Sequence, residues 1–235
     1  TLGDTDDAFD KALQEVGALT SLTDDHTTHA GYSFNGGGNS FSTFAGLEGI
    51  ASGFAGYEEE FVLRYDYSFD ALTLSLSIEQ GVDNSVSDID DTYSIGVAYD
   101  ADLGGVALGI GLGYSANDTD FGTGDAEAYG ISLDAEIGGI EVVLNYSQTE
   151  TGTLEIDHYG IGVTYTVDAL SLHANYGVFD LETPGSSAEV SGFGLAVNYD
   201  LGGGAVVMFG YGSSDVSEVG SDDYETASFG LGLSF

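Results

Sequence analysis

Alternation of apolar residues at every second position most constrains what this chain can fold into, and it runs from Phe61 to the last residue. Eleven segments show it, and one face of each is wholly apolar: its fifty positions hold only Ala, Val, Ile, Leu, Phe or Tyr. A period of two is that of a β-strand whose two faces meet different surroundings. We predict strands at residues 61–69, 72–79, 92–100, 106–115, 128–138, 140–148, 158–167, 170–179, 191–200, 205–212 and 225–235.

The opposite face of these segments is polar and rich in glycine. Besides many Gly, Ser and Asn residues it carries Arg64, Asp66, Asp134, Glu136 and His173. Glycine inside a strand costs stability and offers no side chain for packing. We therefore interpret this face as one on which little is packed.

The connections between the predicted strands alternate in length. Short turns lie at 69–72, 100–106, 137–140, 167–170 and 200–205, and long acidic loops at 80–91, 116–127, 149–157, 180–189 and 213–224. Tyrosines of the apolar face gather near both ends, where an apolar ring with a wet hydroxyl suits a membrane interface. The pattern predicts an antiparallel transmembrane β-barrel, apolar toward lipid and polar toward an aqueous interior.

Composition limits the alternatives. The chain has 235 residues with 40 Asp plus Glu against 2 Lys plus Arg, a formal net charge of −38, which excludes a nucleic-acid binder because phosphates could not be neutralised. A hydrophobic content of 42% argues against disorder, and the absence of cysteine excludes disulfides. A soluble β-sandwich would also alternate, but it does not explain the two groups of tyrosines or the strict order of turns and loops.

The first sixty residues follow a different pattern. Residues 3–19 predict a short helix, with Asp6 or Asp7 as N-cap and with Phe9, Ala12, Leu13 and Val16 at helical spacing. Residues 28–57 are rich in glycine and aromatic residues without clear periodicity, and a long ordered loop of this kind is usually functional. Single-chain bacterial barrels have an even number of strands, so eleven strands lead us to expect that an odd number precedes this chain.

The stretch LGDTDDAFDKAL (residues 2–13), the acidic and aromatic residues that follow it to Tyr57, and the closing strand ending in Phe235 resemble a general porin of the Rhodobacter type from an alphaproteobacterium. In that family sixteen strands form a trimeric pore of the outer membrane, and the long loop after strand five folds into the lumen as the constriction. The resemblance implies that residues 1–57 are the end of strand five plus this loop. It implies that residues 58–235 are strands six to sixteen of the single barrel domain of an N-terminally truncated chain, and that Phe235 belongs to the signal read by the insertion machinery.

A pore has no catalytic residue, because its chemistry is a charged eyelet that selects by size and charge. The candidate residues of the constriction are Asp4, Asp6, Asp7, Asp10, Glu15, Asp24, Asp25 and Arg64. Any one of these acids can equally be a solvated side chain or a helix cap, and Arg64 can equally pair with Asp66. The candidates for the lumen wall are Asp66, Asp134, Glu136 and His173, and His158 shares their register.

Acids of the long loops offer the hard oxygen ligands that Ca²⁺ prefers. The candidates are Asp88, Asp90, Asp91, Asp118, Asp120, Asp222 and Asp223. Their spacing matches no EF-hand, which favours a solvated acidic mouth that attracts cations, whereas the resemblance to calcium-bearing porins supports bound calcium. His26 and His29 are three residues apart, but without a further ligand at suitable spacing we interpret them as part of a polar loop.

Together these features predict a passive outer-membrane channel for small hydrophilic solutes that prefers cations and requires no cofactor. Its expected partners are the lipid bilayer and, from the resemblance, two further copies of the chain. The alternative is a barrel or an acidic β-protein that displays its loops as a surface module for binding or adhesion. An outer-membrane hydrolase is a third candidate, but no convergent set of Ser, His and acid is visible in the sequence.

Overall fold

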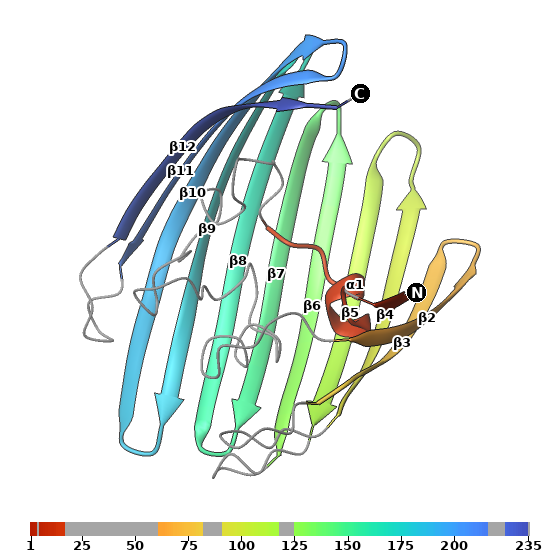
Figure 1. The fold of residues 1–235 in the computed structure, drawn as a ribbon, viewed down its shortest axis with the longest axis vertical. Helices are drawn as coiled ribbons and strands as arrows, with labels where there is room; N and C mark the ends of the chain where they lie inside the picture. The colour runs from red at the N-terminus through yellow and green to blue at the C-terminus, as the bar shows by residue number, and fades with distance from the viewer. Residues whose placement is uncertain (4, 17–60, 82–90, 118–124, 216–223, 235) are drawn as a thin grey trace.

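The computed structural model describes residues 1–3, 5–16, 61–81, 91–117, 125–215 and 224–234, which form one antiparallel sheet and one helix (Figure 1). Each strand pairs with its neighbours along the chain, so that the order in the sheet is the order in the sequence. The elements are β1 (Leu2–Gly3), α1 (Ala8–Ala12), β2 (Val62–Phe69), β3 (Leu72–Glu79), β4 (Thr92–Asp102), β5 (Ala107–Asn117), β6 (Ala126–Ile137), β7 (Ile140–Thr151), β8 (Leu154–Val167), β9 (Leu170–Thr183), β10 (Ser186–Gly202), β11 (Ala205–Asp215) and β12 (Tyr224–Leu233).

The predicted all-β antiparallel architecture is confirmed, and the eleven predicted strands correspond one by one to β2 through β12. Before them, β1 pairs with the start of β2, with Leu2 opposite Leu63 and Gly3 opposite Val62. Among the described residues, β12 pairs only with β11 and β1 covers only two residues of β2. The expectation of sixteen strands stays a prediction.

Two of the five predicted long loops are wrong. β7 and β8 meet in a tight turn at Gly152–Thr153, and β9 and β10 meet at Pro184–Gly185, where Gly185 has φ 93° as the third residue of a Pro–Gly turn of type II requires. The strands leading to these turns still alternate, but with the two faces exchanged: acids such as Glu155 take the outer register, and apolar residues such as Ile156 and Phe179 are buried on the inner one. The other three long loops lie largely outside the described residues.

The apolar face of the sheet points away from the rest of the molecule. Large side chains on it are open, among them Tyr65 at 64%, Leu112 at 49% and Phe229 at 71% of their surface. In water such a continuous apolar surface would be unstable, because monomeric soluble proteins rarely expose patches of more than a few hundred Å². This face therefore matches the lipid-facing surface predicted from the sequence.

Tyrosines line up across neighbouring strands of that apolar face. Tyr114 stands directly opposite Tyr129 and Tyr146 opposite Tyr159, and the rings of the second pair lie 5.1 Å apart. Along β8 the next tyrosine, Tyr165, is six residues beyond Tyr159, which corresponds to roughly 20 Å of strand. This spacing is close to the apolar band of about 25 Å between the aromatic girdles of outer-membrane barrels.

The predicted short turns are confirmed, and they lie together at one end of the sheet, near the C-terminus in Figure 1. Two of them are Gly–Gly pairs with positive φ at both residues: 58° and 79° at Gly138 and Gly139, and 66° and 83° at Gly203 and Gly204. This is the type I′ geometry, whose twist matches that of the flanking strands. In the described residues no helix has the length and apolar character needed to cross a bilayer.

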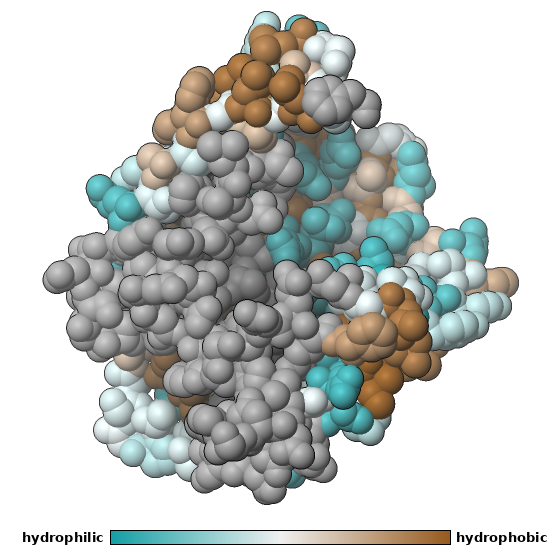
Figure 2. All heavy atoms as spheres, in the orientation of Figure 1, coloured by the Kyte–Doolittle hydropathy of each residue, from teal (hydrophilic) through white to brown (hydrophobic). Residues whose placement is uncertain are grey.

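The sheet is curved, and α1 lies within its concave side in front of the central strands (Figure 1). α1 packs against β3, β4 and β5. Figure 2 shows hydrophilic residues gathered in the part of this hollow that is open to view, with hydrophobic atoms at the margins of the sheet. The polar register of β2–β12 thus forms an inner wall, and residues 6–16 lie on it; we refer to these residues as the inner segment.

Candidate functional site

The inner segment is organised by a short capped helix. Asp7 is its N-cap, and one carboxylate oxygen accepts a hydrogen bond of 2.7 Å from the backbone N–H of Asp10. The four residues predicted to share a helical face are all buried, at 3% exposure for Phe9, 6% for Ala12 and Leu13, and 0% for Val16. The sequence prediction of a capped amphipathic helix is confirmed, although its regular part is only Ala8–Ala12.

Hydrogen bonds from successive strands hold the inner segment to the wall. Ser77 Oγ of β3 accepts from the N–H of Ala8 at 2.8 Å, and Ser94 Oγ of β4 donates to Asp7 at 2.5 Å. Farther along the segment, Ser132 Oγ of β6 accepts from the N–H of Gln14 at 2.8 Å. Asn145 of β7 donates its side-chain N–H to the Gln14 carbonyl at 3.1 Å. These anchoring roles could not be predicted, because serine and asparagine are common throughout the inner register.

Glycines of the wall lie at the points where the inner segment comes closest to the sheet. A Cβ added to Gly96, Gly111 or Gly162 would fall well under 3.0 Å from the carbonyl oxygens of Ala8, Ala12 and Val16, respectively. Gly113, Gly130 and Gly160 lie beneath the side chains of Phe9, Leu13 and Val16. The interpretation that little packs on the glycine-rich face is therefore wrong along this path, where the missing side chains admit another part of the chain.

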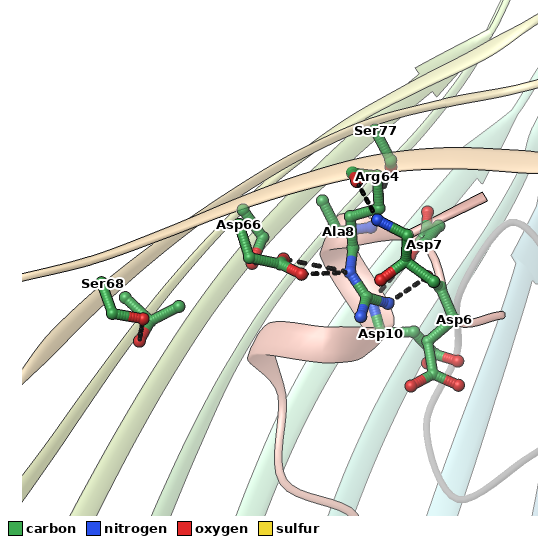
Figure 3. Close-up of polar contacts among 11 residues, drawn as sticks. Asp6, Asp7, Ala8, Asp10, Arg64, Asp66, Ser68 and Ser77 are labelled. Atoms are coloured by element: carbon green, nitrogen blue, oxygen red, sulfur yellow. Dashed lines mark hydrogen bonds and ion pairs between the residues drawn. The ribbon is translucent and has the colours of Figure 1, made fainter.

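Arg64 ties the start of the segment to β2 (Figure 3). Its side chain is 7% exposed, and its Nε donates to both carboxylate oxygens of Asp66, at 3.0 and 3.2 Å. One terminal nitrogen donates to the backbone carbonyl of Asp6, and Ser75 Oγ donates to Asp66 at 2.7 Å. The guanidinium is thus engaged by an ion pair and by the inner segment. The pairing of Arg64 with Asp66 is confirmed, and its role at a constriction stays a prediction.

The acids of the inner segment have different environments. Asp7 is buried under α1, where desolvation raises the pKa of its carboxyl above 3.8. Hydrogen bonds from Asp10 N–H, Ser94 and Phe9 N–H, and then the charge of Arg64, act in the opposite direction. Asp6 and Glu15 are exposed and Asp10 is half-buried, so their carboxylates face the interior space. Asp4, Asp24 and Asp25 lie outside the described residues.

A second group of acids lies on the inner wall nearer the short turns. Asp134 and Glu136 take the inner register of β6 as predicted, and Glu141 stands directly opposite Glu136 on β7. Asp134 and Glu141 are half-buried, whereas Asp100 and Glu136 are exposed. No basic side chain of the described residues pairs with this group, since Arg64 bonds Asp66 and Lys11 lies on α1. Glu141 shares the register but was not among the predicted wall residues.

The two histidines of the inner register are buried. His173 is 4% exposed, and its ring contacts Thr164 at 2.9 Å, Asn175 at 3.1 Å and the backbone of Val16. His158 is 0% exposed and stacks on Phe179 with ring centroids 4.4 Å apart. Both rings are therefore covered parts of the wall, and His173 also marks where the described inner segment ends.

The predicted calcium ligands are mostly outside the described residues, namely Asp88, Asp90, Asp118, Asp120, Asp222 and Asp223. Asp91 is described, and its carboxylate accepts a hydrogen bond of 3.0 Å from the N–H of Gly81. Within the described ranges no three His or acidic side chains converge as metal ligands would. His26 and His29 also fall outside the described residues.

Comparison with known proteins agrees with this geometry. The sequence model of a family described as Gram-negative porin matches residues 1–218. A porin structure refined at 1.8 Å resolution, of the Rhodobacter type, is 25% identical to the chain. It superposes with a TM-score of 0.70, covering 100% of this chain and 76% of the other. No curated protein matches the chain.

Two further solved structures share the fold at lower identity. A BenF-like porin from Pseudomonas fluorescens Pf-5 is 15% identical, with a TM-score of 0.63 over 78% of this chain and 58% of the other. Acinetobacter baumannii OccAB4 is 13% identical, with a TM-score of 0.61 over 74% and 52%. The chain thus spans little more than half the length of these two proteins.

Proposed function

The chain belongs to the Gram-negative porin family and to the bacterial outer membrane, and from this premise we propose that it forms a passive, water-filled channel for small hydrophilic solutes that prefers cations. The observation that carries the proposal is the inner segment lying on a polar inner wall while the opposite face of the same strands is apolar and exposed. Diffusion through such a channel requires no catalytic group and no cofactor.

The inner segment supports a constriction because it occupies interior space without filling it with apolar side chains. Its apolar residues Phe9, Leu13 and Val16 are turned against the wall, while Asp6 and Glu15 remain exposed. Carboxylates held at a narrow point select ions by charge at short range. The segment can therefore narrow the channel and carry its selective charge.

Cation preference follows from the balance of charge. The chain carries 40 acidic residues against 2 Lys plus Arg. Of these two cations, Arg64 is already bound to Asp66, which leaves Lys11 on α1 as the exposed one. Asp134, Glu136 and Glu141, with which no basic side chain of the described residues pairs, add negative potential along the wall. A cleft lined by one sign of charge concentrates the opposite ion.

The proposal also includes assembly into a homotrimer and binding of Ca²⁺ by acids of the long loops. The resemblance to Rhodobacter-type porins supports a homotrimer, in which copies of this chain would cover part of the exposed apolar face. Bound Ca²⁺ at the loop acids is supported by that resemblance and by the ligand chemistry of carboxylates. Cross-linking of the protein in detergent, with and without a calcium chelator, tests both points: a product of three chains supports the trimer, and its loss with the chelator supports bound calcium.

The decisive test is planar-bilayer recording from the inserted protein, with the reversal potential measured in a KCl gradient. We expect stable open steps and a reversal potential of the sign that cation preference produces. The double variant Asp6→Asn with Glu15→Gln should lower the selectivity, and Asp168→Asn, in a short turn far from the inner segment, is the matched control. Absence of conductance from correctly inserted protein would exclude the channel and favour the loops as a binding surface.

A further inference from the structure

Three wall glycines each lie beneath a main-chain carbonyl of the inner segment. Gly96 on β4 lies under Ala8, Gly111 on β5 under Ala12, and Gly162 on β8 under Val16. These positions are spread from the start of α1 to the end of the described segment. We propose that Gly96, Gly111 and Gly162 determine the width of the channel by letting the backbone of the inner segment sit directly on the wall. This inference rests on the proposed channel function and extends it from charge to size.

Backbone conformation does not explain these three glycines. Glycine is obligatory where φ is positive, and the described positive-φ glycines lie in turns and at Gly3. None of Gly96, Gly111 and Gly162 is among them. Each sits in a regular strand, where glycine weakens the sheet relative to residues with a side chain. What they provide is space on the inner side.

The space is used by main chain rather than by movable side chains. A Cβ on Gly111 would meet the carbonyl oxygen of Ala12 and, at 2.6 Å, Ser132 Oγ. Ser132 is the anchor of the Gln14 N–H and stands directly opposite Gly111 in the sheet. Along the inner segment, a point where the backbone lies directly on a wall glycine is thus followed by a point where a wall serine holds it by a hydrogen bond. Lifting the carbonyl would also break the adjacent hydrogen bond.

The direction of any displacement is set by the wall itself. The segment has the sheet on one side and the interior on the other, so an added methyl group can only push it inward. The exposed side chains of Gln14 and Glu15 would move with the backbone. Beneath Phe9 and Leu13 the nearest contacts of Gly113 and Gly130 are with side chains, which can rotate away, and the closest carbonyl oxygens would lie farther off, at 3.2 and 3.3 Å. The three glycines under carbonyls are therefore the ones that fix the position of the segment.

The test compares Gly111→Ala with Gly232→Ala, its matched control. Gly232 also lies on the inner register, but a Cβ there would come closest to the flexible end of Met208, at 3.1 Å from Cε, and the nearest backbone atom, the Val206 carbonyl oxygen, would be in ordinary contact at 3.9 Å. We expect Gly111→Ala to lose single-channel conductance and to exclude the larger sugars in liposome swelling, while Gly232→Ala matches wild type. Gly162→Ala, on a different strand, repeats the test if Gly111→Ala does not fold.

Amide hydrogen exchange supplies a readout that does not depend on conduction. In wild type the N–H groups of Ala8 and Gln14 are bonded to wall serines and should exchange slowly. Gly111→Ala should speed exchange at Gln14, and Gly232→Ala should not. If the wild type conducts and Gly111→Ala has the same conductance and the same sugar exclusion, the inference about channel width is wrong, while the proposed function stands. A wild type that inserts but does not conduct would overturn the proposed function, and with it the role in width, whatever the exchange shows.

Discussion

At the scale of single residues, one arginine organises the entry of the inner segment. Arg64 joins its neighbour on the same strand, through the carboxylate of Asp66, to the N-terminal end of the chain, through the carbonyl of Asp6 and, by its own backbone, Thr1. Its guanidinium is almost fully buried, while Asp66 keeps 30% of its surface open. A planar guanidinium with several fixed N–H donors suits this combination better than an ammonium group does.

Replacing Arg64 by Gln should loosen the inner segment. The variant removes an ion pair and a charge-assisted hydrogen bond to Asp6, and we expect a loss of about 1–2 kcal/mol in local stability, reduced by the partial exposure of Asp66. Amide exchange of residues 8–16 measures the effect. Asp66→Asn is the comparison, because it keeps an acceptor for Arg64. An equal effect from both changes would assign the stability to the ion pair, and no effect from Arg64→Gln would contradict the anchoring role.

Asp7 should make the docking of the segment depend on pH. It lies on the inner segment, outside the membrane-spanning strands, and burial raises the pKa of its carboxyl above the ordinary 3.8. A raised pKa means that the docked state prefers the neutral form, so docking is strongest below pH 3.8 and weakens as the pH rises through the raised pKa. Asp7→Asn keeps an N-cap side chain and should remove this dependence. Exchange of the Asp10 amide, corrected for its intrinsic pH dependence, provides the measurement; a persistent slope in the variant would contradict the assignment.

The sequence predicted the cap and the buried face of α1 because both are local patterns. Asp7 followed by apolar residues at helical spacing is visible within ten residues. The anchors Ser77, Ser132 and Asn145 were not predictable, since each acts on a segment more than sixty positions away. The same holds for Gly111, whose role appears only when another segment lies over it. Residues that act at long range need the register of the sheet to be known.

At the scale of elements, the strands were predictable where the apolar face is the outer one and not where the two faces exchange character. Inside the band bounded by tyrosines, alternation placed every strand from β2 to β12. Beyond it, β7–β8 and β9–β10 continue as hairpins with acids on the outer register, and the sequence indicated loops there instead. The hydrogen-bonded ladder continues there with its apolar side chains, such as Ile156, Phe179 and Val190, on the inner face. Each hairpin is closed by a tight turn and extends a sheet already formed.

These extensions place like charges directly opposite one another. On the outer register of β6–β9, four glutamates form one row, namely Glu127, Glu150, Glu155 and Glu182. Directly opposed like charges destabilise a sheet, and opposed pairs contribute roughly 0.2–1 kcal/mol each. The described residues offer no Lys or Arg near this row, since Lys11 and Arg64 belong to the interior. The outer ends of these hairpins should therefore be the salt-sensitive part of the sheet.

Glu155→Gln should stabilise the extension at low salt. It removes one of the two middle charges of the row while keeping the oxygen that accepts from Gln148. Exchange of the β8 amides near Leu154 should slow in the variant at about 0.01 M salt and match wild type at about 1 M, where the screening length falls from about 30 to about 3 Å. Asp168→Asn, in a turn at the opposite end, controls for the loss of charge. Equal gains at both salt concentrations would show that repulsion is not the cause.

At the scale of the whole molecule, the exposed apolar band and the large negative charge are separate features that lie in different parts of the structure. The exposed apolar band requires lipid around the sheet, whatever the charge of the chain. The net charge of −38 is carried by the loops, the hairpin extensions and the interior, and the outer positions of the band between the girdles are uncharged. Charge can therefore act on ions that approach or cross the channel without opposing insertion into the bilayer.

The dependence of selectivity on salt separates two sources of the proposed cation preference. Acids spread over the loops and hairpins act at a distance, and their field is screened as the Debye length falls from about 10 Å at 0.1 M to about 3 Å at 1 M. In the proposed channel, carboxylates of the inner segment would lie beside the passing ion and would be screened much less. At a fixed KCl ratio we expect the magnitude of the reversal potential to decrease as the mean concentration rises, and then to level off at a value that is not zero. The level reached at high salt should drop in Asp6→Asn with Glu15→Gln. A potential that vanishes at high salt in wild type would place the selectivity in the distant acids and not in the inner segment.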